Sequence, residues 1–333
     1  MTISAPIVFT NPKNYSDIAD AIRAKNGTST TYRPEEMASA IMDITPAFSG
    51  TITLSQNGTF SVGGYASASV SVPDNPYAAR WTDNANFTTF TDESVTTIPY
   101  GTFAYTLNLA NVSFPSATTI GSYAFGYCFK LANGSFPEVA TISQYAFQYC
   151  SSFRSGQVLN STVFPKVKGT LGAYAFRGCQ YLTGVDLSLV TTVGAQAFSA
   201  CSRITNVNMA GVTSTGGGAF SYLTTCTSYS LPNLQTVGSS TFYSNWALQT
   251  LTLPSCTKIS AYAFRYCSKM MSLYLPGSSI PTLASTTVFA NMPMSVSVNN
   301  VYGSIYVPST MVDSYKAATV WKTYAARIVA IPE

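Results

Sequence analysis

A motif built on one phenylalanine recurs along most of the chain and fixes the spacing of the residues around it. GSYAFGYC, SQYAFQYC, GAYAFRGC, GAQAFSAC and SAYAFRYC are five copies of it. Successive phenylalanines are 22 residues apart, with one interval of 29 and a last one of 25. A fixed period in the twenties is typical of a solenoid, whose coils share one hydrophobic core. The phenylalanines are Phe103, Phe125, Phe147, Phe176, Phe198, Phe220, Phe242 and Phe264, and then Phe289 in a degenerate ending.

Each repeat also contains a short segment with the alternation of a strand. An apolar residue lies eleven positions after most of these phenylalanines, as in ALQTLTLP and KMMSLYLP, and proline follows it in most coils. We expect a strand with one buried face, ended by the proline because proline cannot donate to a sheet. The phenylalanine motif is expected as a short helical turn, and the interval of 29 as an insertion around residues 155–163. About eight coils therefore predict an α/β repeat solenoid with a parallel sheet and short helical turns.

The repeat resembles the BspA-like leucine-rich repeats, whose unit reads like L-x-x-I-x-L-P…I-G-x-x-A-F-x-x-C. The resemblance covers residues from about 97 to 290, and residues 291–333 look like the strand and helix that close many such arrays. We expect Thr310 and Asp313 to form a capping box at the start of that helix. Its apolar face would cover the open end of the core with Val312, Tyr315, Ala318 and either Trp321 or Lys322.

Five cysteines occupy one position of the repeat, three residues after the phenylalanine. Thr106, Leu223 and Asn245 take this position in three other coils, and the exchange with leucine predicts a small, buried, apolar position that holds reduced thiols. Disulfides between adjacent coils are the alternative, but an odd total of seven cysteines argues against them. The five cysteines are Cys128, Cys150, Cys179, Cys201 and Cys267.

The residue types present do not favour an enzyme, a cofactor site or a metal site. The chain has no histidine, so a Ser-His-Asp or Cys-His pair does not exist in it. Glu138 and Asp186 are isolated carboxylates, and STGGGAF, residues 214–220, lacks the lysine of a phosphate-binding loop. Residues 97–290 carry nine basic and two acidic side chains without any basic run. We therefore expect no nucleic-acid partner. Residues 204–257 carry no charge, but Thr, Ser, Asn, Gly and Pro interrupt them every few residues, so we expect no membrane insertion either.

The residues before the repeats divide into three modules. NYSDIADAIRAKNGTSTTYRPEEMASAIMDI predicts two short helices within residues 1–45. GTITLSQNGTFSVGGYASASVSVP alternates around Asn-Gly, which predicts a hairpin with a third strand within residues 46–75. Residues 76–96 are expected to be a linker or a first capping coil. The N-terminal segment also lacks the basic and apolar regions of a secretion signal, so we expect no export by the usual route.

Both N-terminal modules resemble segments at the start of tailed-phage and prophage structural proteins. The helical piece is similar to I-A-D-A-I-R-x-K-x-G-T…Y-x-P-x-E-M-x-x-A-I. The strand piece is similar to N-G-T-Y-x-V-x-x-Y-A-S-A-x-V-x-V, with Phe60 where tyrosine is usual. The resemblance implies a region that attaches the protein to a virion, in a tail, baseplate or fibre.

The polar positions of the predicted strands define a candidate binding surface. They alternate with the buried positions and should line the exposed face of the sheet, although solvation alone is the alternative reading. Tyrosines two residues before and after the phenylalanine form further columns, suited either to recognition or to stacking from coil to coil. The candidate binding residues on the strands are Asn111, Ser113, Asn133, Ser135, Asp186, Asn206, Asn208, Ser230, Thr252 and Tyr274.

These features together predict a non-enzymatic phage virion protein of the tail, baseplate or fibre type, assembled in the host cytoplasm. Residues 1–75 would contact other virion proteins, and the solenoid would bind a glycan or protein on a host surface. We expect a homo-oligomer on the particle. The alternatives are a capsid or tail decoration protein without a receptor, and a BspA-like adhesin of the bacterial cell surface.

Overall fold

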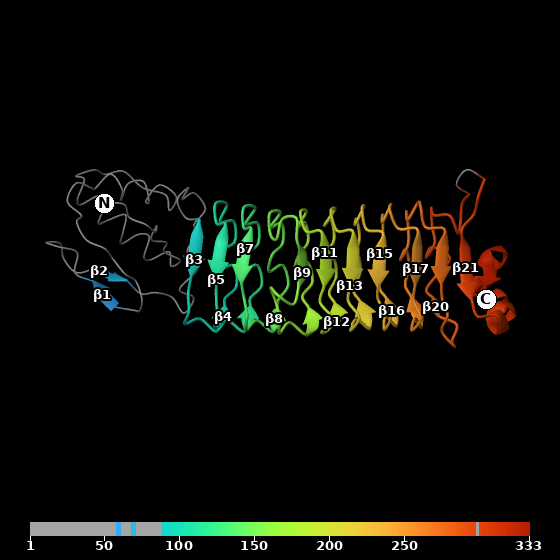
Figure 1. Ribbon diagram of the computed structural model, residues 1–333, viewed down its shortest axis with the longest axis horizontal. Coiled ribbons are helices and arrows are strands. Elements are labelled where there is room, and N and C mark those ends of the chain that lie inside the picture. The colour runs from blue at the N-terminus through green and yellow to red at the C-terminus, as the bar shows by residue number, and fades with distance from the viewer. Residues whose placement is uncertain (1–57, 61–67, 71–87, 298–299) are drawn as a thin grey trace, which may run out of the picture.

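The computed structural model describes residues 58–60, 68–70, 88–297 and 300–333 (Figure 1). Within the expected β module, β1 (Gly58–Phe60) pairs antiparallel with β2 (Ala68–Val70). The two expected helices of residues 1–45 and the other residues of the three N-terminal modules, up to residue 87, lie outside the described residues.

Two stacks of parallel strands run along the solenoid, and Figure 1 shows them on opposite sides of the coils. The hydrogen-bonded ladder of the first stack is continuous within β3–β7, β9–β15 and β17–β22. The first stack comprises β3 (Thr89–Thr91), β5 (Asn111–Ser113), β7 (Asn133–Ser135), β9 (Val158–Asn160), β11 (Gly184–Asp186), β13 (Asn206–Asn208), β15 (Ser228–Ser230), β17 (Thr250–Thr252), β19 (Ser272–Tyr274), β21 (Ser304–Val307) and β22 (Ile328–Ala330). The second comprises β4 (Thr97–Ile98), β6 (Thr119–Ile120), β8 (Thr141–Ile142), β10 (Gly169–Leu171), β12 (Val190–Val193), β14 (Ser214–Thr215), β16 (Thr236–Val237), β18 (Lys258–Ile259) and β20 (Thr282–Leu283).

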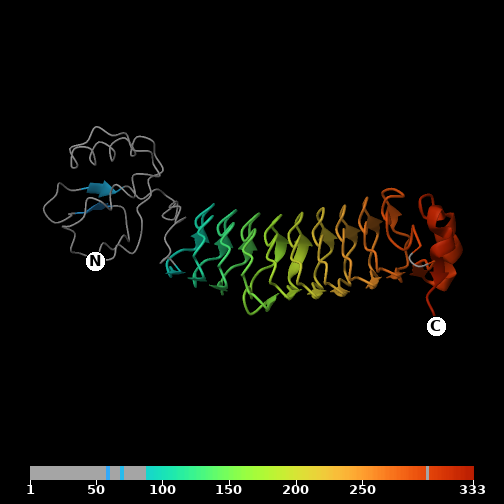
Figure 2. The same ribbon diagram turned by 90° about the horizontal axis from the view of Figure 1, so that it is seen from above.

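The solenoid has about eleven turns, more than the eight or so that the phenylalanine spacing predicts, because strands without the motif extend it at both ends. β3 lies in the segment expected as a linker or capping coil. β21 and β22 belong to the expected C-terminal cap and continue the first stack in parallel register, with Leu273, Ile305 and Ile328 as successive partners. Seen from above, the coils follow one another in a single direction up to these last elements (Figure 2).

The interval of 29 residues holds an insertion that is divided between the two sides of a strand. Residues 158–160, which lie inside the expected insertion, form β9 and pair with β11. β7, β9 and β11 start at residues 133, 158 and 184, which is 25 and then 26 residues apart. In the regular coils this distance is 22 residues, so three extra residues precede β9 and four follow it. The extra residues therefore lie around residues 155–163, where the insertion was expected, and the strand of this coil, with Val158 and Leu159, lies among them.

The phenylalanines form one continuous stack through the centre of the solenoid, which confirms the predicted core. All nine are fully buried. Consecutive ring centroids lie between 5.1 and 6.1 Å apart, and the Phe176, Phe198 and Phe220 rings are parallel to within 7°. The apolar strand residues also point inward, as predicted, and Met209, Leu231 and Leu253 are each at most 1% exposed. One core therefore runs through coils that have no separate core.

The segment around each phenylalanine is a run of hydrogen-bonded turns, whereas a short helical turn was expected. In one coil the N–H groups of Tyr123, Phe125 and Tyr127 donate to carbonyl oxygens of the next coil at 2.7–3.2 Å. The N–H groups of the residues in between close turns within the coil, as Gly126 N–H does onto the Tyr123 carbonyl at 3.0 Å. This alternation needs left-handed backbone two residues before and after each phenylalanine from Phe103 to Phe264, with φ between 51° and 73°. Each such non-glycine residue costs about 1–2 kcal/mol, which the inter-coil hydrogen bonds offset.

The residue three positions after the phenylalanine is buried, as predicted. In most coils, however, its side chain also donates a hydrogen bond, so the position is not simply apolar. All five cysteines there donate Sγ–H to the phenylalanine carbonyl of the preceding coil, at 2.9–3.3 Å. Asn245 makes the equivalent bond through Nδ2 to the Phe220 carbonyl at 3.0 Å, which explains why a polar amide replaces a thiol. All seven cysteines of the chain are buried and free.

The C-terminal elements close the core much as expected, except for their capping. Tyr315 in α3 (Val312–Ala317) and Trp321 at the start of η2 (Trp321–Arg327) are buried, whereas Lys322 is exposed. Val312 and Ala318 also pack against the core. Thr310 and Asp313 form no capping box, because η1 (Ser309–Met311) runs directly into α3 and the N-cap residue, Met311, makes no side-chain cap hydrogen bond. A capping residue needs extended backbone at the helix start, and Met311 is already helical.

A glycine at the corner four residues before the phenylalanine lets successive coils approach closely. A Cβ on Gly194 would lie 2.5 Å from the Ala173 nitrogen and 2.7 Å from the Leu171 oxygen, which are backbone atoms. We expect Gly194→Ala to destabilise the solenoid by about 1–3 kcal/mol through overpacking. The control is Gly217→Ala, whose Cβ would meet only the Ser239 oxygen at an ordinary 3.5 Å. Denaturant unfolding of both variants is the measurement, and equal midpoints would contradict the close approach.

Candidate functional site

The outward side of the first stack, here called the strand face, carries the candidate binding residues. The structure places all ten of them there with exposed or half-buried side chains: Asn111, Ser113, Asn133, Ser135, Asp186, Asn206, Asn208, Ser230, Thr252 and Tyr274. The residues that alternate with them on the same strands, such as Val207 and Leu251, are buried. The strand alternation therefore gives their orientation, and their role in binding stays a prediction.

Parallel register brings equivalent residues of neighbouring coils into contact on the strand face. Asn133 Nδ2 donates to Asn111 Oδ1 at 2.9 Å, and Asn208 Nδ2 donates to Asp186 Oδ1 at 3.2 Å. Tyr274 stacks on Tyr306 of β21 with ring centroids 4.4 Å apart and planes 10° apart. These contacts reduce the rotamer freedom of the side chains before any partner arrives, so less entropy is lost on binding.

The sequence reasoning missed several members of this surface. Thr91, Asn160 and Tyr306 occupy the same column as Ser113 and Tyr274. Asn160 was hidden by the irregular interval, and Tyr306 by its place beyond the last repeat. Tyr306 could have been predicted, because the alternation of apolar residues in GSIYVP matches that in SLYLP of β19.

The tyrosines on either side of the phenylalanine form the turn face, a surface of the run of turns distinct from both strand stacks. Tyr123, Tyr145 and Tyr174 stack in a row with centroids 4.3 and 4.6 Å apart and planes within 9°. Tyr105 and Tyr127 begin a second row at 4.6 Å. The rows are part of the solenoid wall, yet their edges reach solvent, and Tyr105 is 47% exposed. The stacking from coil to coil is therefore confirmed, and a role of these tyrosines in recognition stays a prediction.

Burial keeps several of the thiols in their protonated, unreactive form. Burial raises the pKa of Cys201 and of Cys267 to about 12, so both thiols stay protonated at neutral pH. Burial also raises the pKa of Cys150 and of Cys179 well above the ordinary thiol value. No group of three or more potential ligand side chains in this part of the chain could hold a metal ion. A solenoid of this kind is typical of non-enzymatic binding proteins.

Charge on the surface is sparse and predominantly positive. Lys166 and Glu138 form an exposed ion pair between neighbouring coils. Several arginines lie on tyrosine rings: the Arg203 guanidinium carbon is 4.6 Å from the centroid of Tyr181, and the corresponding carbon of Arg265 is 4.8 Å from that of Tyr266. Such stacking orients the guanidinium while leaving its donors available. Among the helices of the described segments, none has both the length and the hydropathy needed to cross a bilayer.

Comparison with known proteins gives one family match and several similar folds. A sequence profile described as BspA type leucine rich repeat region matches residues 76–162 and 151–271, with six copies. A leucine-rich repeat protein from Eubacterium ventriosum ATCC 27560 is 19% identical, with 61% of this chain covering 64% of that one at a TM-score of 0.41. The pneumococcal vaccine antigen PcpA is 16% identical, with 74% of this chain covering 79% of that one at a TM-score of 0.35.

A leucine rich cell surface protein from Faecalibacterium prausnitzii A2-165 is also similar. It is 15% identical, and 84% of this chain covers 100% of that one at a TM-score of 0.28. The chain spans 64% of the length of the Eubacterium ventriosum protein. No curated protein sequence matches the chain.

Proposed function

The chain belongs to the BspA-type leucine-rich repeat family, and we propose that it is a non-enzymatic adhesion protein whose strand face binds a glycan or a protein on a host cell surface. The observation that carries the proposal is the repetition of exposed polar side chains on consecutive parallel strands. Neighbouring strands lie about 4.8 Å apart, so the face repeats the same donors and acceptors at short, regular intervals. Solenoids use such extended faces to bind partners.

The hydrogen-bonded pairs of the strand face favour binding over mere solvation. The side-chain amide of Asn208 donates one of its two Nδ2 protons to Asp186. The second Nδ2 proton and the side-chain oxygen Oδ1 make no hydrogen bond with another described side chain. Tyr274 presents a partly exposed ring that Tyr306 holds in place. Amide groups and aromatic rings that are already oriented suit both saccharides and protein loops.

The same proposal extends to where the protein acts. We place it in a tailed-phage virion, in a tail, baseplate or fibre, with residues 1–75 contacting other virion proteins and the chain forming a homo-oligomer there. The support is the resemblance of residues 14–44 and 50–73 to segments of phage structural proteins. The alternative is an adhesin of the bacterial cell surface, which membership of the BspA-type family favours. A decoration protein of capsid or tail without a receptor is the other alternative.

Immunoelectron microscopy with antibody against the solenoid separates these locations. Label at the tail tip or fibres of particles would support the virion proposal. Label over the whole capsid would favour a decoration protein. Label on the bacterial envelope, with none on particles, would overturn the virion proposal in favour of the cell-surface adhesin.

Substitutions on the strand face test the adhesive role itself. We expect Asn208→Ala and Tyr274→Ala each to weaken binding of the full chain to host cells roughly fivefold, since one hydrogen bond or one aromatic contact contributes about 1 kcal/mol. The matched control is Thr191→Ala, because Thr191 is exposed on β12 in the second stack. Binding would be measured by flow cytometry with labelled protein. Equal binding by the wild type and all three variants would contradict a role for the strand face.

A further inference from the structure

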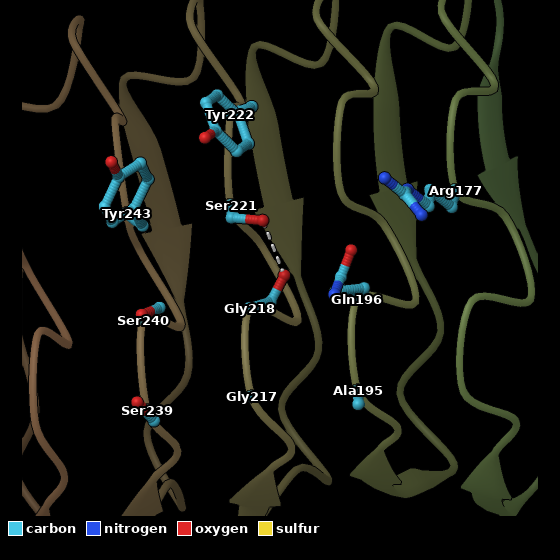
Figure 3. Close-up of a pocket in the computed structure, with 10 residues that line it drawn as sticks. All are labelled: Arg177, Ala195, Gln196, Gly217, Gly218, Ser221, Tyr222, Ser239, Ser240 and Tyr243. Carbon is cyan, nitrogen blue, oxygen red and sulfur yellow. Dashed lines mark hydrogen bonds between the residues drawn. The ribbon is translucent and has the colours of Figure 1, made fainter.

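The turn face contains a depression of about 600 Å³ (Figure 3). It lies where the sequence interrupts a row of tyrosines. In the row two residues before the phenylalanine, Tyr174 and Tyr262 lie four coils apart. The three coils between them carry smaller side chains there, namely Gln196, Gly218 and Ser240. The backbone is left-handed at all of these positions, with φ between 51° and 66°. The coils are therefore regular, and the depression exists because three rings are missing.

Aromatic rings and polar groups line this depression. Figure 3 shows Tyr222 and Tyr243 at one side of it and Arg177 at the other. The rings of Tyr222 and Tyr243 lie 5.3 Å apart and are tilted by 57°, and Tyr222 is 44% exposed. Gln196 uses its Nε2 to donate to the Tyr174 hydroxyl at 3.3 Å, which leaves its carbonyl oxygen for a ligand. Amphipathic rings beside hydroxyl and amide groups match the chemistry of a saccharide.

An arginine stands at each end of the interrupted row. The Arg177 guanidinium carbon lies 5.7 Å from the centroid of Tyr149 and 5.6 Å from that of Tyr174. Four coils further on, the guanidinium carbon of Arg265 lies 5.1 Å from the ring centroid of Tyr262 and 4.8 Å from that of Tyr266. The Nε atoms of both arginines are buried and have no hydrogen-bond partner among the described residues. Neither arginine has a carboxylate partner in this part of the chain.

The spacing of the two arginines fits a chain-like ligand. At about 4.8 Å per coil, four coils separate them by roughly 19 Å along the solenoid axis. Residues 97–290 carry nine basic side chains against two acidic ones, so the surroundings also favour an anion. A guanidinium held on a ring presents its remaining donors in a planar fork that suits a carboxylate or a phosphate.

We propose that this depression binds an anionic saccharide polymer that lies along the solenoid axis, with sugar rings against Tyr222 and Tyr243. One acidic group lies at Arg177 in the depression, and another lies at Arg265, one coil beyond the lining residues. The site goes beyond the proposed function, because it lies on the turn face and takes a ligand of a defined class. It does not depend on the strand face, so a failure of one surface to bind says nothing of the other.

The first test compares ligands of matched shape by isothermal titration calorimetry of the full chain. The probes are an oligogalacturonate, its neutral methyl ester and a phosphorylated oligomannoside. We expect one of the two anionic probes to bind at least about tenfold more tightly than the neutral ester, the ratio that one charge-assisted hydrogen-bond pair provides. Preference for the oligogalacturonate assigns the acidic groups as carboxylates, and preference for the phosphorylated oligomannoside assigns them as phosphates. Binding of neither anionic probe, or equal binding of the ester, would overturn the proposal.

Three variants locate the binding. Arg177→Gln is expected to weaken it about tenfold or more. Its control, Arg203→Gln, removes an equally charged arginine that also lies on a tyrosine ring, 4.6 Å from Tyr181, outside the depression. Ser240→Tyr fills the depression with the side chain that four other coils carry at the same left-handed position. It should abolish binding while the melting temperature stays unchanged. Normal binding by Arg177→Gln and Ser240→Tyr, or an equal loss with Arg203→Gln, would overturn the site.

Discussion

Phe198→Ala is expected to destabilise the solenoid by about 3–5 kcal/mol, the usual range for removing a fully buried phenylalanine. Phe198 has no exposed surface and lies between Phe176 and Phe220, with ring centroids 5.6 and 5.9 Å away. Its removal opens a cavity that the neighbouring coils do not fill, because their inter-coil hydrogen bonds fix the spacing. Both the buried area and two ring contacts are lost together.

Denaturant unfolding, followed by circular dichroism, measures this effect. Phe129→Ala is the control, since Phe129 is 44% exposed and lies outside the stack. We expect the control to change the free energy of unfolding by less than about 0.5 kcal/mol, as surface substitutions do. A loss below about 1 kcal/mol in Phe198→Ala would mean that the phenylalanine stack does not hold the coils together.

Trp321→Ala is the second substitution with a large expected effect, about 3–5 kcal/mol, because it opens the C-terminal end of the core. Trp321 is 2% exposed, and its Nε1 donates to the Pro281 carbonyl at 2.7 Å. Its ring lies 5.1 Å from that of Tyr315 and 6.0 Å from that of Phe289, the last ring of the stack. The substitution therefore removes packing and also leaves a buried carbonyl without its donor, which adds to the loss.

Trp246→Ala is the matched control for the cap, because Trp246 is 51% exposed. Amide hydrogen exchange of residues 272–330 would show where stability is lost. In Trp321→Ala we expect faster exchange in β21 and β22, with the central coils less affected, since each coil contacts only its neighbours. Unchanged exchange in both strands would contradict the closing role of Trp321.

The period of the phenylalanines was enough to predict the repeat, the buried stack and the parallel strands, because each depends only on local alternation and a fixed interval. The orientation of Asn208 and Tyr274 follows from the same alternation. The family match and the parallel strands of the first stack agree with the expected BspA-like solenoid, whereas the second stack was not predicted. The virion role of residues 1–75 stays a prediction.

The conformation around Phe125 could not be predicted in this way. Left-handed backbone at a tyrosine is rare, and sequence reasoning expects glycine or asparagine there. Tyr123 and Tyr127 adopt it, with φ of 58° and 63°, because their N–H groups reach carbonyls of the next coil. That partner lies about one repeat away in the sequence, so no local pattern contains the information.

The hydrogen bonds at the cysteine position and the missing capping box also depend on contacts that no local sequence pattern contains. The exchange of cysteine with Leu223 indicated an apolar position, whereas the exchange with Asn245 was the better guide, since both Asn245 and the cysteines donate to a carbonyl of the preceding coil. Thr310 and Asp313 matched a capping pattern, but the turn of η1 before α3 leaves no extended residue to serve as the cap. In each case a neighbouring segment decided the geometry.

Hydroxyl-radical footprinting of the full chain, free and bound to host cells, tests most directly whether the strand face is the adhesive surface. Tyr274 and Tyr306 report on the strand face, and Trp246 is an exposed reference residue within the repeats. We expect oxidation of Tyr274 and Tyr306 to fall on binding, while oxidation of Trp246 stays constant. Binding that leaves both tyrosines as reactive as in the free protein would contradict this expectation.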